Sequence, residues 1–131
     1  MVPLRGTQPK VGRWLIYGII DPDSGTLIYI GKTHKRREPR LREHVESSLA
    51  GSSAPIHVRI RQLISLGRAP EVFVLKCVEP NGSWPEQERQ EIAFWRSMSP
   101  EDLPITIRPQ TLRSHPVIVR SVEILNVKAG G

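Results

Sequence analysis

The feature of this sequence that most constrains its fold is a pair of apolar runs joined by a short turn-forming segment. Residues 13–20 read RWLIYGII and residues 26–33 read TLIYIGKT. Between them stands DPDSG, whose Asp, Pro, Ser and Gly residues favour the tight backbone of a hairpin turn. The sequence therefore predicts a β-hairpin over residues 13–33.

Two helices are expected next. Leu41, Val45 and Leu49 recur every four residues after Pro39 and predict a helix that ends at Gly51. Residues 55–67 predict a second helix, which opens on proline and closes on glycine. Its apolar face would carry Ile56, Ile60, Leu63 and Ile64, and its opposite face Arg59 and Arg61.

The second half of the chain predicts a strand over residues 71–78 and a helix from Ser83, where Ser83 and Glu86 have the spacing of a capping box. Residues 117–127 have the pattern of a final strand, and residues 99–120 are interpreted as an insertion or loop. This order of elements predicts an α+β fold, with a small three-stranded, mainly antiparallel β-sheet flanked by helices.

Length and charge limit the classes of function. The 131 residues fit one domain, which we place at residues 13–131 after a flexible basic arm at 1–12. A net charge of +6 and a pI near 10.1 favour a nucleic-acid partner. A membrane partner is not expected, because no apolar run approaches the roughly 18 residues of a span. The single Cys77 excludes an internal disulfide and indicates an intracellular, cytoplasmic setting.

Two tyrosines hold related positions in the hairpin. Tyr17 and Tyr29 could simply form a cross-strand aromatic contact. However, Gly31 follows Tyr29 inside a strand, where glycine costs stability, and this indicates that another group approaches the backbone closely. Lys32 then adds a positive charge at the strand end.

Two further candidates lie on the first predicted helix. Arg40 and His44 are four residues apart, so their side chains project from one face of the helix. A guanidinium can bind a phosphate through paired hydrogen bonds, and an imidazole can transfer a proton near neutral pH. The alternative is that both residues belong to a solvated basic face.

Glu88 is a carboxylate on the apolar stripe of Trp84, Ile92 and Trp95, where it needs a cation or hydrogen-bond donors. Mg²⁺ could supply this charge with only one protein carboxylate, or Glu88 could form an ion pair with Arg40 or Arg89. Of its neighbours, Glu86 is interpreted as the capping-box partner and Glu91 as solvent-exposed.

The remaining histidines and the cysteine receive structural interpretations. His34 and His57 are expected at the surface, and His115 is expected in a loop. No histidine pair has the spacing of a zinc site, so a zinc enzyme is not expected. Cys77 is expected to fill core space or face solvent, because no nearby feature indicates a lowered thiol pKa.

Taken together, these residues resemble the GIY-YIG nuclease superfamily from about Trp14 to Gly131. Leu15-Ile16-Tyr17 stands where the family has its GIY, with Leu15 in place of the first glycine, and Tyr29-Ile30-Gly31 is an intact YIG. The spacing of Arg40 and His44, Glu88, and Asn126 before a Gly-Gly pair are similar to later family motifs. The gap from Tyr29 to Arg40 is longer than in typical members, so Arg36, Arg37 and Arg42 are alternatives to Arg40.

The resemblance implies a DNA endonuclease that uses one divalent metal ion, Mg²⁺ or Mn²⁺. Glu88 would hold the metal, and Arg40 would clamp the phosphate. Tyr17, or else Tyr29, would act as general base with help from positive charge on Lys32 or His44. Asn126 would orient the site by hydrogen bonding. DNA contacts are expected from Lys32, Lys35, Arg36, Arg37, Arg42 and Arg59.

Two other functions fit the same residues. The first is a basic module that binds nucleic acid without cutting it, and the second is a nuclease directed at RNA. Members of the family usually take their specificity from an appended domain or a partner, so a partner protein or a homodimer is also expected.

Overall fold

The computed structural model describes residues 14–33, 37–78, 83–107 and 116–126, with the backbone alone at residues 37, 38 and 84. The expected arm at 1–12 lies outside these ranges. None of the described helices has the length and apolar character of a transmembrane span. The elements are β1 (Leu15–Asp21), β2 (Thr26–Thr33), α1 (Arg37–Leu49), α2 (Pro55–Ser65), β3 (Glu71–Cys77), α3 (Trp84–Arg96), η1 (Pro100–Asp102), β4 (Ile105–Ile107), β5 (Val117–Val119) and β6 (Ser121–Val122).

The predicted hairpin is confirmed. Strands β1 and β2 pair antiparallel from Leu15 opposite Thr33 to Asp21 opposite Thr26. Gly25 adopts a φ of 72° in the turn, which a side chain would oppose, and its N–H donates to Asp21 O at 2.8 Å. The two apolar runs thus become neighbouring strands at the centre of the sheet.

The main sheet has four strands in the order β3-β1-β2-β6. Strand β3 pairs antiparallel with β1, whereas the short β6 pairs parallel with β2. The α+β class is therefore confirmed, but the prediction of three strands is wrong. The predicted strand at 117–127 divides after Val119, so that β5 and β6 belong to different sheets.

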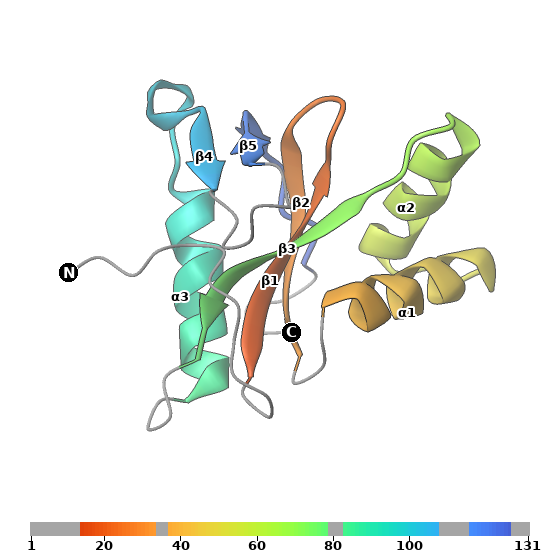
Figure 1. Cartoon of the computed structure of the whole chain (residues 1–131), viewed down its shortest axis with the longest axis horizontal. Coiled ribbons are helices and arrows are strands. Elements are labelled where there is room, and N and C mark those ends of the chain that lie inside the picture. The colour runs from red at the N-terminus through yellow and green to blue at the C-terminus, as the bar shows by residue number, and fades with distance from the viewer. Residues whose placement is uncertain (1–13, 34–36, 79–82, 108–115, 127–131) are drawn as a thin grey trace.

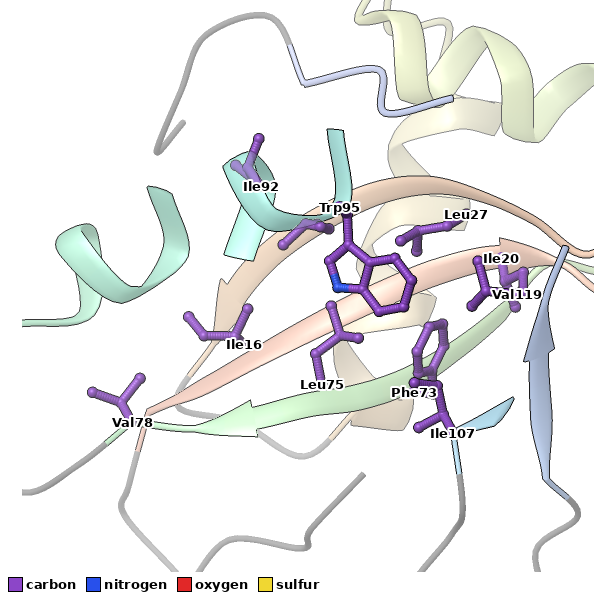
Figure 2. Close-up of a cluster of buried hydrophobic side chains, with 11 residues drawn as sticks. Ile16, Ile20, Leu27, Phe73, Leu75, Val78, Ile92, Trp95, Ile107 and Val119 are labelled. Atoms are coloured by element: carbon purple, nitrogen blue, oxygen red, sulfur yellow. The ribbon is translucent and has the colours of Figure 1, made fainter. Parts of the chain in front are cut away.

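Helices cover both faces of the main sheet, with α3 on one side and α1 and α2 on the other (Figure 1). Every residue of β1 is buried, as its continuous apolar run requires for a strand packed on both faces. Figure 2 shows the cluster on the α3 face, where Trp95 and Ile92 pack over Ile16 and Leu75. The cluster on the other face joins Tyr17, Ile19, Ile28 and Val72 to Ile56, Ile60 and Leu63 of α2.

Residues 99–120, expected to be an insertion or loop, contribute a second, two-stranded sheet. Strands β4 and β5 pair antiparallel, and Ile107 and Val119 join the buried cluster on the α3 face (Figure 2). Two apolar positions in the expected helix stripes are instead exposed: Leu49 by 66% and Ile64 by 37%. Leu49 is the last residue of α1, and Ile64 is next to the last residue of α2, so both lie in the last turns of their helices.

The chain after β6 continues along β2 towards its YIG residues. The N–H groups of Glu123 and Leu125 donate to Leu27 O at 2.9 Å and Ile28 O at 2.8 Å. Asn126 is buried and bonds twice to the backbone of Ile30, accepting from its N–H at 3.1 Å and donating to its carbonyl at 2.6 Å. Asn126 therefore provides hydrogen-bond partners for the backbone of Ile30 on the edge of β2 that faces away from β1.

We predict that Asn126→Ala destabilises the fold by about 2 kcal/mol or more, because each buried group left without a partner costs about 1–3 kcal/mol. Urea unfolding would measure this change. Glu123→Ala, in the same segment, is the control, because its exposed ion pair with Arg59 should contribute less than about 1 kcal/mol. Equal losses in the two variants would contradict this role of Asn126.

Candidate active site

The two hairpin tyrosines lie over Gly31 on the sheet face that α1 and α2 cover. Tyr17 is opposite Gly31 in the register of β1 and β2, and the ring centroids of Tyr17 and Tyr29 are 6.2 Å apart. A Cβ at residue 31 would lie 2.5 Å from Tyr17 Cζ and 2.8 Å from Tyr29 Cε1. The close approach expected at Gly31 is therefore made by the tyrosine rings, which occupy the space of the missing side chain.

Helix α1 brings both of its predicted site residues to Tyr17. Arg40 Nε donates to the Tyr17 hydroxyl at 3.0 Å, and His44 Nε2 lies 2.7 Å from the same oxygen. Arg40 also donates to Glu43 Oε2 at 2.7 Å. Among the arginines considered for this position, Arg40 contacts the tyrosine, whereas Arg42 is exposed on α1.

Burial sets the protonation of this cluster. It raises the pKa of both Tyr17 and Tyr29 above the usual phenol value, although the Arg40 guanidinium opposes this shift. Burial, followed by the positive charge of Arg40, lowers the pKa of His44 to about 3. His44 is therefore neutral at physiological pH, and the expectation that it supplies positive charge to Tyr17 is wrong.

Glu88 lies on α3, which covers the other face of the sheet (Figure 1). Its negative charge adds to the effect of burial in raising the pKa of both Tyr17 and Tyr29. Glu88 is 1% exposed, and its Oε1 is buried with no hydrogen-bond partner among the described residues. Burial raises its pKa, while the charges of Lys32 and Arg89 oppose that shift.

The two arginines considered as ion-pair partners of Glu88 bind other carboxylates. Arg40 pairs with Glu43 at 2.7 Å and Arg89 pairs with Glu86 at 2.9 Å. The buried Oε1 of Glu88 therefore has no hydrogen-bond partner among the described residues. A carboxylate oxygen is also a ligand that hard divalent cations prefer.

The neighbouring glutamates differ from expectation. Ser83 is the N-cap of α3, but its side chain makes no capping hydrogen bond, so Glu86 is not the partner of a capping box. Glu91 was expected to be exposed but is buried, and it accepts a hydrogen bond from Trp95 Nε1 at 3.1 Å. The indole donor provides the compensation that a buried carboxylate needs.

His57 was expected at the surface, but it belongs to this cluster. Its Nε2 lies 3.1 Å from His44 Nδ1, and its Nδ1 lies 2.6 Å from Ser52 Oγ. No motif spacing pointed to it. The available signal was its position in the first turn of a helix that follows the first helix after a short loop, because two helices joined in this way lie close together.

The described basic residues are not gathered at one point. Lys32 is half-buried at the end of β2, and Arg59 forms an ion pair with Glu123 at 2.5 Å. Arg61 donates to the carbonyls of Ser48 and Ser52, so it braces the loop between α1 and α2.

The remaining predicted positions lie outside the described residues or side chains: His34, Lys35, Arg36, Arg37, Trp84, His115 and the Gly-Gly pair. Cys77 is half-buried at the end of β3.

A surface pocket of about 340 Å³ adjoins the cluster. Its polar wall includes Tyr29, Arg40, His44 and His57, and its apolar wall includes Ile56 and Leu125. This arrangement combines a guanidinium, a phenol and two imidazoles at one concave surface, which is a suitable setting for phosphate binding and proton transfer.

No family model, curated protein or solved structure matches this chain. Within the described ranges, no group of three or more His, Cys, Asp or Glu side chains is arranged to hold a metal ion.

We predict that His44 stays neutral while the pH is lowered to about 4. An unfolded histidine gains a proton near pH 6.5, whereas folded His44 gains one only near pH 3. The unfolded state binds more protons between these values, so the contribution of His44 to stability is complete above 6.5 and is lost as the pH falls. An NMR titration of its ring protons would check this, and a midpoint above 6 would contradict it.

Proposed function

We propose that this chain is a metal-dependent DNA endonuclease of the GIY-YIG type. The observation that carries the proposal is the binding of one buried tyrosine hydroxyl by both predicted helix residues: Arg40 donates to Tyr17 O, and His44 Nε2 lies 2.7 Å from it. The motif residues thus meet through hydrogen bonds, whereas a solvated basic face would leave them apart.

Glu88 is the proposed metal ligand. Its buried Oε1 has no partner in the described part of the chain, so a cation there would remove a desolvation cost that the protein alone leaves in place. When bound, Mg²⁺ or Mn²⁺ supplies positive charge that neutralises the scissile phosphate and stabilises the departing sugar oxygen.

Each remaining residue has a distinct role in this proposal. Arg40 uses Nε and Nη1 in the bonds to Tyr17 and Glu43, and its Nη2 carries two more donors that can bind a phosphate oxygen. Tyr17 receives the proton of the attacking water, and Tyr29 is the alternative residue for this step. Asn126 holds Ile30, next to Gly31, and therefore acts by positioning β2.

The net charge of +6 supports a polyanionic substrate. DNA is the proposed substrate, with single-stranded or structured RNA as the alternative. Specificity would come from a partner protein or from a second copy of the chain, as the resemblance to the family implies.

We predict that the Glu88→Gln variant no longer nicks supercoiled plasmid in the presence of Mg²⁺. The amide keeps the shape of the side chain but loses the negative charge that would bind the metal. Unfolding curves should remain close to those of the wild type. Glu86→Gln, on the same helix and exposed, is the matched control and should retain activity. Nicking by Glu88→Gln at the wild-type rate would rule out the metal assignment.

A module that binds nucleic acid without cutting it is the second candidate, and the raised pKa of Tyr17 favours it, because a protonated phenol is a poor base. Incubation of DNA with the protein in Mg²⁺ or EDTA separates the two. Binding in both conditions with intact DNA in both would support the module, whereas cleavage in Mg²⁺ alone supports the nuclease.

A further inference from the structure

A continuous chain of hydrogen bonds runs from Tyr17 to the loop between α1 and α2. Tyr17 and His44 are joined at 2.7 Å, His44 and His57 at 3.1 Å, and His57 and Ser52 at 2.6 Å. His44 uses Nε2 for Tyr17 and Nδ1 for His57, and His57 uses Nε2 for His44 and Nδ1 for Ser52. Two histidines bonded in series in this way can pass a proton through their rings.

Arg40 occupies one acceptor position of the Tyr17 hydroxyl, because its guanidinium can only donate. We assign the hydroxyl hydrogen of Tyr17 to His44 Nε2, which lies 2.7 Å away. Neutral His44 then carries its hydrogen on Nδ1 and donates to His57 Nε2.

The same assignment extends to the loop. His57 carries its hydrogen on Nδ1 and donates to Ser52 Oγ, which also accepts from the N–H of Ala54 at 3.3 Å. Every bond therefore donates from the buried tyrosine outward.

We propose that Tyr17, His44 and His57 form a proton relay, in which His57 is the final acceptor of the proton released by the attacking water. This proposal rests on the proposed nuclease function and assigns a role to a residue that no motif marked. His57 acts through His44 and Tyr17 and is a positioning residue that does not touch the substrate.

The transfers balance in one step. As the water oxygen bonds to phosphorus, its proton goes to Tyr17 O, the Tyr17 proton goes to His44 Nε2, and the Nδ1 proton of His44 goes to His57 Nε2. The electron pair of the broken P–O bond leaves with the sugar oxygen, which takes a proton from solvent. Tyr17 and His44 end neutral, and His57 ends as an imidazolium that releases its proton to water.

This relay removes a difficulty with tyrosine as the base. Burial raises the pKa of Tyr17, so a free phenolate would be unfavourable. In the relay the hydroxyl loses its own proton as it receives another, and no phenolate forms. The positive charge arises instead on His57, which is half-buried and lies on the wall of the 340 Å³ pocket.

The groups that face His57 set its protonation. Burial, followed by the charges of Arg40 and Arg61, lowers its pKa below the ordinary 6.5, and Glu43 lies on the same pocket wall. His57 is therefore neutral and able to accept a proton at physiological pH. Below its pKa, both ring nitrogens carry hydrogens, and the relay is blocked.

The first test is independent of activity. In a protein labelled with ¹⁵N at histidine, long-range ¹⁵N–¹H correlation spectra at pH 7.5 should show both His44 and His57 with the hydrogen on Nδ1. A hydrogen on Nε2 of either ring would overturn the proposed direction, and with it the relay.

The second test measures plasmid nicking with Mg²⁺ against pH. His57→Gln keeps a side chain that can form hydrogen bonds but cannot accept a proton, and should lower the rate by about 10²-fold, the lower end of general acid–base contributions. The wild-type rate should fall once the pH drops below the lowered pKa of His57, which lies under the ordinary 6.5, and this acidic limb should be absent in His57→Gln. Gln62→Ala, exposed on the same helix, is the control and should keep both rate and profile.

Chemical rescue separates proton transfer from folding. The His57→Ala variant leaves a space beside the pocket, and added imidazole should restore part of its rate. An active wild type with an unchanged rate and pH profile in His57→Gln would overturn the relay alone. Intact DNA with the wild type in Mg²⁺, on plasmid, flapped and four-way-junction substrates, would overturn the proposed function itself.

Discussion

Burial of β1 on both faces and pairing along both of its edges is the constraint on which the site depends. All seven of its residues are buried, with β2 on one side and β3 on the other. A strand held in this way cannot shift by one residue without turning its apolar side chains to the wrong face. Tyr17 therefore has a fixed position, and Gly31 opposite it provides the space in which the hydroxyl meets α1.

The same burial determines the chemistry. In a surface cluster of a tyrosine, an arginine and a histidine, the histidine would change its charge with solution pH near neutrality. Here desolvation keeps Tyr17 and His44 neutral and leaves Arg40 as the cation, so the hydroxyl is held between a group that donates and a group that accepts. A hydroxyl held in this way gives up its proton more readily when it receives another proton at the same time than when it must become a phenolate.

Local patterns predicted much of the fold and part of the site. The hairpin, the helices and the common helix face of Arg40 and His44 follow from short-range spacing. Their contact with Tyr17, 23 and 27 positions away, does not. Strand β6 and the bonds of Asn126 to Ile30 join residues about a hundred positions apart, so no local pattern indicates them. His57 and Glu91 are expected at the surface because polar residues usually lie there, whereas both have partners in the folded chain. Tertiary packing brings His57 to His44, and Glu91 accepts from Trp95 one turn further along the same helix.

Glu88 shows why these long-range contacts matter for function. A buried carboxylate oxygen without a donor destabilises the fold, and nearby Glu91 demonstrates that α3 can provide a donor where one is needed. An apolar residue at position 88 would avoid the cost altogether. The two buried carboxylates of α3 thus differ in one respect: Glu91 accepts a hydrogen bond from Trp95, whereas Oε1 of Glu88 has no partner among the described residues.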